Sequence, residues 1–206
     1  MALGVLASGR GSNFQAILDA IHQGTLDAIV KVVISNKADA LVLERSRSHQ
    51  IPGIFLDPKP FAQKENSREA YDQAVGGVLQ EHRVDAVVLA GYMRIVTSVL
   101  IRQFPWKIFN IHPSLLPAFP GLHAQRQALE WGAKVSGCSV HFVTEGVDEG
   151  PVIIQEAVPI LDHDTEESLS ERILKREHEI FPKALQWFAE GRLSRDGRRV
   201  SLIHSV

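Results

Sequence analysis

Short apolar runs alternate along this chain with longer segments in which apolar residues recur every three or four positions. The short runs are rich in β-branched residues and predict strands, whereas the longer segments have the period of an α-helix. The expected strands cover residues 3–7, 29–34, 54–56, 85–90, 108–110, 139–143 and 151–158. The expected helices cover residues 14–21, 39–49, 67–82, 97–104, 124–131 and 165–191. This alternation is typical of an α/β fold.

The order of the elements indicates a single open, mostly parallel, twisted sheet with helices on both faces. The last two strands are expected to pair as antiparallel neighbours, and Asp196-Gly197 has the signal of a hairpin turn. No repeat or interdomain linker is evident. We therefore expect one domain over residues 1–206, with halves of about 1–105 and 106–193 and a C-terminal tail at 194–206.

A glycine-rich turn, S-G-R-G-S-N at residues 8–13, separates the first strand from the first helix. Ser12 or Asn13 is expected to cap that helix, whose first backbone N–H groups and dipole favour an anion. The turn is therefore a candidate phosphate cradle, with a plain tight connection as the alternative. A dinucleotide site is less well supported, because Phe14 stands where G-x-G-x-x-G has its third glycine.

The stretch F-N-I-H-P-S-L-L-P, residues 109–117, concentrates the chemistry of the chain. Asn110 and His112 are two positions apart, so their side chains share a face of an extended segment. Pro113 restricts His112, and the segment is expected to leave its strand there as a stiff loop. With Asp148 from V-D-E-G-P, these groups supply oxyanion donors and a proton carrier for acyl-type transfer. Spacing alone does not separate Asp148 from Glu149.

Composition narrows the class of ligand and the compartment. The chain has 206 residues, 45% of them hydrophobic, and a net charge of −2, which gives no electrostatic footprint for nucleic acid or an acidic membrane. Its single cysteine, Cys138, excludes an internal disulfide framework. The N-terminus lacks the positive region of a secretory signal, and no apolar run approaches the roughly 20 residues of a membrane span. We expect a cytoplasmic protein with small-molecule substrates.

Three alternative interpretations concern these and other residues: a metal site, a serine hydrolase and simple core packing. A metal site at His112, His123, His141 and Asp148 is weakly supported, since no H-E-x-x-H and no paired cysteines are present. A serine hydrolase would need a G-x-S-x-G turn, which the chain lacks. Met93 and Ile95, which follow a predicted strand, are by default core residues.

The motifs together resemble a known family. S-G-R-G-S-N, I-S-N-K-A-D-A, S-R-E-A-Y-D, L-A-G-Y-M-R-I, N-I-H-P-S-L-L-P, P-G-L-H, H-F-V-T and V-D-E-G-P-V-I occur in this order, from about residue 3 to 193. In this respect the chain resembles the phosphoribosylglycinamide formyltransferases, folate-dependent enzymes of purine synthesis with a Rossmann-like N-terminal half. The resemblance implies transfer of the formyl group of 10-formyltetrahydrofolate to glycinamide ribonucleotide. No metal is implied, and the protein would be a monomer or homodimer.

The resemblance also implies residue roles. The catalytic residues would be Asn110, His112 and Asp148. Residues binding the ribonucleotide would be Gly11, Ser12, Asn13 and Glu177, and Lys175 or Arg176 is a further candidate at the phosphate. The folate site would be lined by Arg68, Met93, Arg94, Ile95, Val96, Val143 and Thr144. The tail after Leu193 does not align with the family.

Three rival functions remain. A 10-formyltetrahydrofolate hydrolase normally carries an extra N-terminal regulatory domain, for which no room is expected before Leu3. A methionyl-tRNA formyltransferase would need a C-terminal RNA-binding domain and a basic surface. A non-catalytic nucleotide-binding module would account for the glycine turn but not for Asn110, His112 and Asp148 together.

Overall fold

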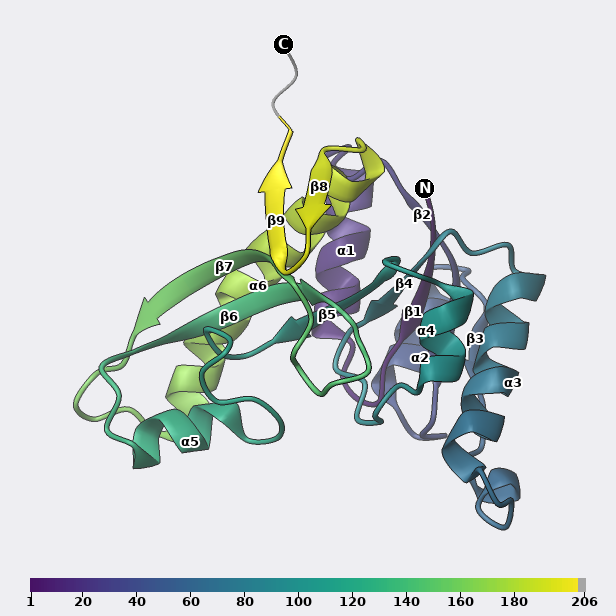
Figure 1. Ribbon diagram of the computed structural model, residues 1–206, viewed down its shortest axis with the longest axis horizontal. Coiled ribbons are helices and arrows are strands. Elements are labelled where there is room, and N and C mark those ends of the chain that lie inside the picture. The colour runs from purple at the N-terminus through teal and green to yellow at the C-terminus, as the bar shows by residue number, and fades with distance from the viewer. Residues whose placement is uncertain (204–206) are drawn as a thin grey trace. The chain divides into compact units, whose positions relative to one another are not determined.

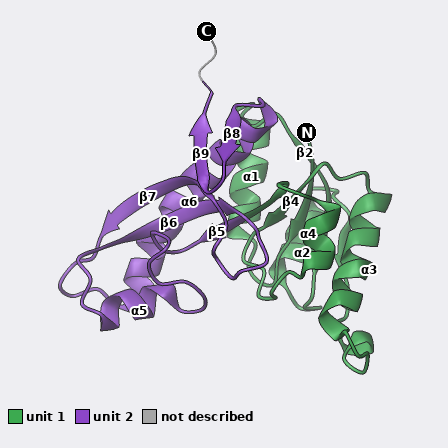
Figure 2. Ribbon diagram, viewed as in Figure 1, with its two compact units in different colours: residues 1–109 green, residues 110–206 purple. Residues whose placement is uncertain are grey.

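The computed structural model describes residues 1–203. The chain divides into two compact units, Met1–Phe109 and Asn110–Val206, which are coloured separately in Figure 2. The predicted single domain over residues 1–206 stays a prediction. Within the described residues, no helix combines the length and the apolar character needed to cross a membrane.

Unit 1 contains a parallel sheet. Its strands are β1 (Ala2–Leu6), β2 (Ile29–Ser35), β3 (Gly53–Phe55) and β4 (Ala86–Leu89), in the order β3-β2-β1-β4. All four residues of β4 are buried, as in a strand that is covered on both faces. The four strands lie within one or two residues of their predicted positions.

The helices of unit 1 connect these strands. They are α1 (Ser12–His22), α2 (Leu41–Ser48), α3 (Ser67–Glu81) and α4 (Ser98–Gln103), with a 3-10 turn, η1, at Lys59–Phe61. Helices α3 and α4 pack against each other (Figure 1). The predicted cap of α1 is wrong, because neither Ser12 nor Asn13 is its N-cap residue and no side chain makes a capping hydrogen bond there.

Gly11 occupies the N-cap position of α1 instead. Its φ of 73° lies in the left-handed region that glycine adopts without strain. A Cβ atom at Gly11 would lie 2.7 Å from Cγ2 of Val42, so the close approach of α2 also requires a glycine. The turn is therefore shaped by backbone freedom and packing, not by a side-chain cap.

Unit 2 is built around an antiparallel pair of strands. Strand β6 (Val135–Phe142) pairs with β7 (Val152–Pro159), which confirms the predicted antiparallel neighbours and places Ser139 opposite Gln155. Both strands pack against the long helix α6 (Glu166–Ala189), as Figure 1 shows. The Thr165 side chain accepts a hydrogen bond from the Ser168 N–H and so caps α6.

The remaining elements of unit 2 are short. Helix α5 (Ala124–Glu130) precedes β6, and β8 (Leu193–Asp196) and β9 (Arg199–Leu202) form the predicted terminal hairpin. Strand β5 (Ile108–His112) begins in the last two residues of unit 1 and ends in unit 2. The expectation that the strand would end at Asn110 is wrong, because His112 is its last residue.

Candidate active site

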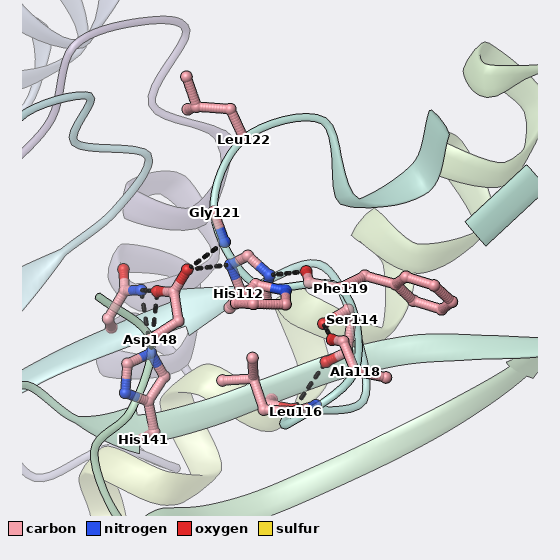
Figure 3. A network of polar contacts seen from close by, with 12 residues as sticks. His112, Ser114, Leu116, Ala118, Phe119, Gly121, Leu122, His141 and Asp148 are labelled. Atoms are coloured by element: carbon pink, nitrogen blue, oxygen red, sulfur yellow. Dashed lines mark hydrogen bonds and ion pairs between the residues drawn. The ribbon is translucent and has the colours of Figure 1, made fainter. Parts of the chain in front are cut away.

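The end of β5 and the loop between β6 and β7 bring together the three side chains predicted to be catalytic. Nδ1 of His112 lies 3.2 Å from Oδ2 of Asp148, and Nδ2 of Asn110 donates to Oδ1 of the same carboxylate at 3.3 Å. The Gly121 backbone N–H also donates to Oδ2, at 2.8 Å (Figure 3). Asn110 and His112 therefore share a face of β5, as the sequence predicted, and that face is directed at one carboxylate.

Opposing effects act on the protonation of the His112 ring. Its Nε2 lies 2.9 Å from the carbonyl oxygen of Phe119, and its Nδ1 faces Asp148. Carbonyl and carboxylate oxygens only accept, so both contacts are hydrogen bonds only in the imidazolium form. Burial acts against that form and lowers the pKa of His112 below its usual value, while Asp148 and the Phe119 carbonyl act to raise it.

Asp148 is held as a carboxylate. Burial alone would raise its pKa, but the nearby His141 and His112 rings and the Gly121 N–H together hold that pKa below the usual value. Its backbone φ is 55°, a left-handed conformation that short Asp and Asn side chains tolerate better than most. The turn thus directs Asp148, and not Glu149, at the end of β5. Glu149 is exposed.

His141, at the end of β6, is a site residue that the sequence analysis considered only as a metal ligand. It is 2% exposed, its Nδ1 lies 2.9 Å from the Phe142 carbonyl oxygen, and its Nε2 lies 3.1 Å from Nδ2 of Asn110. The Phe142 carbonyl accepts a hydrogen from Nδ1. Nε2 also lies 3.6 Å from Oδ1 of Asp148, so His141 contacts both the Asn110 amide and the carboxylate and fixes their orientation. Its position two residues after Ser139 on a predicted strand gave no signal for this role.

The other candidate metal ligand does not join this cluster. His123 is the N-cap residue of α5, its side chain is 61% exposed, and its Nδ1 lies 3.8 Å from Oε1 of Glu166. Within residues 1–203, no group of three or more His, Cys, Asp or Glu side chains is arranged to hold a metal ion. The expectation that no metal takes part stays a prediction.

The predicted phosphate residues of unit 1 lie at the start of α1. Gly11 is the N-cap, and Ser12 and Asn13 are the first two helical residues, so their N–H groups lie at the positive end of the helix dipole. The first turn of α1 contains no acidic side chain. Nε of Arg45, from α2, donates to the Arg10 carbonyl oxygen at 2.9 Å and holds the preceding turn in place.

The predicted folate residues of unit 1 lie in the segment after β4 and at the start of α3. Met93 and Ile95 are 61% and 52% exposed, so the default assignment of these two residues to the core is wrong. Val96 is buried, and Arg68 is exposed in the first turn of α3. The Arg94 guanidinium lies 4.3 Å from the centre of the Tyr71 ring, a cation–π contact.

The remaining predicted residues belong to unit 2. Val143 and Thr144 are half-buried and follow β6 directly, at the start of the loop that carries Asp148. Glu177 lies in α6 and is 7% exposed. A carboxylate this deeply buried is uncommon without a specific role or partner.

At the end of β5, the α/β chain brings together an amide, an imidazole and a carboxylate. These are the groups that a group-transfer enzyme uses. The chain belongs to the formyl transferase family, because the family model described as "Formyl transferase" matches residues 1–185.

Relatives of known function define the branch of the family. The chain is 46% identical to phosphoribosylglycinamide formyltransferase of Escherichia coli strain K12 over 193 residues, which cover 94% of this chain and 89% of that protein. It is 49% identical over 189 residues to the trifunctional purine biosynthetic protein adenosine-3 of Drosophila melanogaster, covering 91% of this chain. The chain spans only 14% of the length of that protein.

A solved structure shows the same fold. Glycinamide ribonucleotide transformylase 1 from Symbiobacterium toebii superposes with a TM-score of 0.96 at 54% identity, covering 99% of this chain and 94% of that one. The fold class predicted from the sequence, α/β with a mostly parallel sheet, is confirmed by this match.

Proposed function

We propose that this protein transfers the formyl group of 10-formyltetrahydrofolate to the primary amine of glycinamide ribonucleotide, a step of purine synthesis. The observation that carries the proposal is the Asp148 carboxylate, which contacts both Asn110 and His112. The similarity to phosphoribosylglycinamide formyltransferase of E. coli over nearly the full length of both chains supports this substrate pair.

Asn110 and His112 stabilise negative charge on the formyl oxygen as the amine attacks the formyl carbon. A donor placed at such an oxygen typically contributes about 3 kcal/mol. Of the two hydrogen bonds of the Asn110 amide, the one to Asp148 is longer, 3.3 Å against 3.1 Å to His141. We assign this longer bond as the one that gives way to the developing oxyanion, which protonated His112 also stabilises.

Asp148 carries the proton. The amine loses a proton as its nitrogen bonds to the formyl carbon, and the folate nitrogen needs one as its bond to that carbon breaks. A carboxylate with a pKa below its usual value is ionised at neutral pH and accepts this proton, directly or through a water, and then returns it to the leaving nitrogen. The balance needs no metal and no covalent enzyme intermediate.

The binding roles follow the two units. In unit 1 the N–H groups of Gly11, Ser12 and Asn13 at the start of α1 would hold the ribonucleotide phosphate. In unit 2 the buried Glu177 would accept from the ribose hydroxyls. The reduced folate would contact Arg68, Met93, Arg94, Ile95, Val96, Val143 and Thr144. We place the enzyme in the cytoplasm and keep both monomer and homodimer as expectations.

The test is to supply 10-formyltetrahydrofolate with and without glycinamide ribonucleotide and to follow the release of tetrahydrofolate. Release that depends on the amine is the expected result. Release without the amine would assign the chain as a hydrolase, and no release in either case would assign it as a binding module.

A further inference from the structure

The hydroxyl of Ser139 joins β6 and β7 to the loop that follows β5. Ser139 is 0% exposed, and its Oγ donates to the Ser114 carbonyl oxygen at 2.6 Å. The same Oγ accepts from the Leu116 N–H at 3.0 Å and from Nε2 of Gln155 at 2.9 Å. One donor and two acceptor positions are the full capacity of a hydroxyl group, so Ser139 is saturated.

The loop from residue 114 to 118 is fixed by this hydroxyl and by two further contacts. Nε2 of Gln155 also donates to the Leu116 carbonyl oxygen at 2.8 Å. The Ser114 hydroxyl donates to the Ala118 carbonyl oxygen, which closes the loop (Figure 3). Both polar groups of the Leu116 backbone are therefore bound to side chains of β6 and β7.

This loop leads directly to Phe119, whose carbonyl oxygen lies 2.9 Å from Nε2 of His112. Phe119 has a φ of 53°, a conformation that a bulky residue keeps only when its surroundings hold it. The polar contacts at Leu116 and Ala118 supply that restraint three residues and one residue before Phe119.

We propose that Ser139 is a positioning residue for His112: by anchoring the loop at Ser114 and Leu116, it holds the Phe119 carbonyl where it accepts the Nε2 hydrogen. Ser139 does not touch the reacting atoms in this account. It acts on the reaction by keeping the imidazole oriented with Nδ1 directed at Asp148, and this role rests on the proposed formyl transfer.

The environment of His112 predicts the sign of the effect. The groups that face its ring are Asp148 from the β6–β7 loop, His141 from β6 and the Phe119 carbonyl. The carbonyl contact raises the pKa of His112 against the effect of burial. Loosening that contact therefore lowers the pKa of His112 further and reduces the imidazolium fraction at neutral pH.

A matched pair of variants on one strand tests the proposal. Ser136 lies on β6 and is 1% exposed, and its hydroxyl has no hydrogen-bond partner within the described part of the chain. Ser139→Ala and Ser136→Ala thus remove the same atom from equally buried sites on one strand. In Ser139→Ala we expect kcat to fall about tenfold, the effect of weakening the single Phe119–His112 hydrogen bond, with KM changed less than about twofold. Ser136→Ala should match the wild type.

The imidazole itself gives a second measurement that does not depend on activity. The ¹⁵N resonances of His112 are followed against pH by NMR in the wild type and in both variants. A lower pKa of His112 in Ser139→Ala, but not in Ser136→Ala, supports the proposal. Identical titrations of the two variants would overturn it, even with formyl transfer by the wild type intact.

If Ser139→Ala does not fold, the variant Gln155→Ala tests the same proposal. Gln155 is exposed on β7, so Gln155→Ala removes the hydrogen bonds to the Leu116 carbonyl of the loop and to the Ser139 hydroxyl without opening a buried cavity. We expect a fall in kcat of about threefold and a lower pKa of His112. An unchanged titration of His112 in folded Gln155→Ala would refute the positioning role. A wild type without formyl transfer would instead refute the proposed function and leave the titration result standing.

Discussion

Replacing Asp148 by asparagine removes the charge that the site is built around and keeps the shape of the side chain. The carboxylate accepts from the N–H groups of Gly121 at 2.8 Å and of Asn110 at 3.3 Å, and its Oδ2 faces Nδ1 of His112 at 3.2 Å. An asparagine oxygen can replace one of these acceptors. Its NH₂ group cannot accept from His112, which therefore favours the neutral ring.

Two losses set the magnitude of the effect. A hydrogen bond between charged partners contributes about 1.5–3 kcal/mol, and general acid–base catalysis contributes about 100- to 10,000-fold. Both losses act through one carboxylate and do not add. We therefore expect Asp148→Asn to lower kcat by about 100- to 10,000-fold, with a much smaller change in KM.

The assay is release of tetrahydrofolate in the presence of glycinamide ribonucleotide, with thermal unfolding to check that the variant folds. Glu149→Gln is the matched control, since Glu149 is the exposed acidic neighbour in the same loop. It should keep activity within about twofold. Activity of Asp148→Asn within tenfold of the wild type, or equal damage from Glu149→Gln, would refute the assigned role.

Four further predictions concern the same chain. His112→Ala should lower kcat by at least about 100-fold with the fold intact, as measured by turnover and circular dichroism; near-normal turnover would contradict it. Glycinamide riboside without its phosphate should bind far more weakly than the ribonucleotide in calorimetry, and equal affinity would remove the phosphate site at α1. Gly150→Ala should destabilise the protein by more than about 2 kcal/mol in denaturant unfolding, because a Cβ there would overlap the Phe142 carbonyl oxygen. The pKa of His112 is lowered in the folded state, so on acidification the unfolded state binds the proton of His112 first. The contribution of His112 to the free energy of unfolding is therefore lost as pH falls from about 6.5 through the pKa of the folded state. The free energy of unfolding of His112→Ala should therefore depend less on pH in that window than that of the wild type, and an equal dependence would contradict the shift.

Sequence patterns predicted the strands, the helices and the meeting of Asn110 with His112, because these depend on local period and on residues two apart. The choice of Asp148 over Glu149 depends on a left-handed backbone turn, which spacing does not reveal. The part played by His141 depends on the end of β6 approaching the end of β5 through the Asn110 amide.

The predicted side-chain cap of α1 is wrong for a different reason. A serine and an asparagine before a helical segment have the right chemistry for a cap, but Gly11 already occupies the N-cap position. The approach of Val42 from α2 makes a glycine necessary there, and this contact is set by tertiary packing. Local propensity therefore located α1 but not the residue at its N-cap.

The fate of an isotope-labelled formyl group tests the central claim most directly. Wild-type protein is given formyl-labelled 10-formyltetrahydrofolate and glycinamide ribonucleotide, and the products are identified by mass spectrometry. If Asn110, His112 and Asp148 direct the formyl group to the amine, the label appears on the ribonucleotide in amounts equal to the tetrahydrofolate released. Label recovered as free formate, with the ribonucleotide unmodified, would contradict the account.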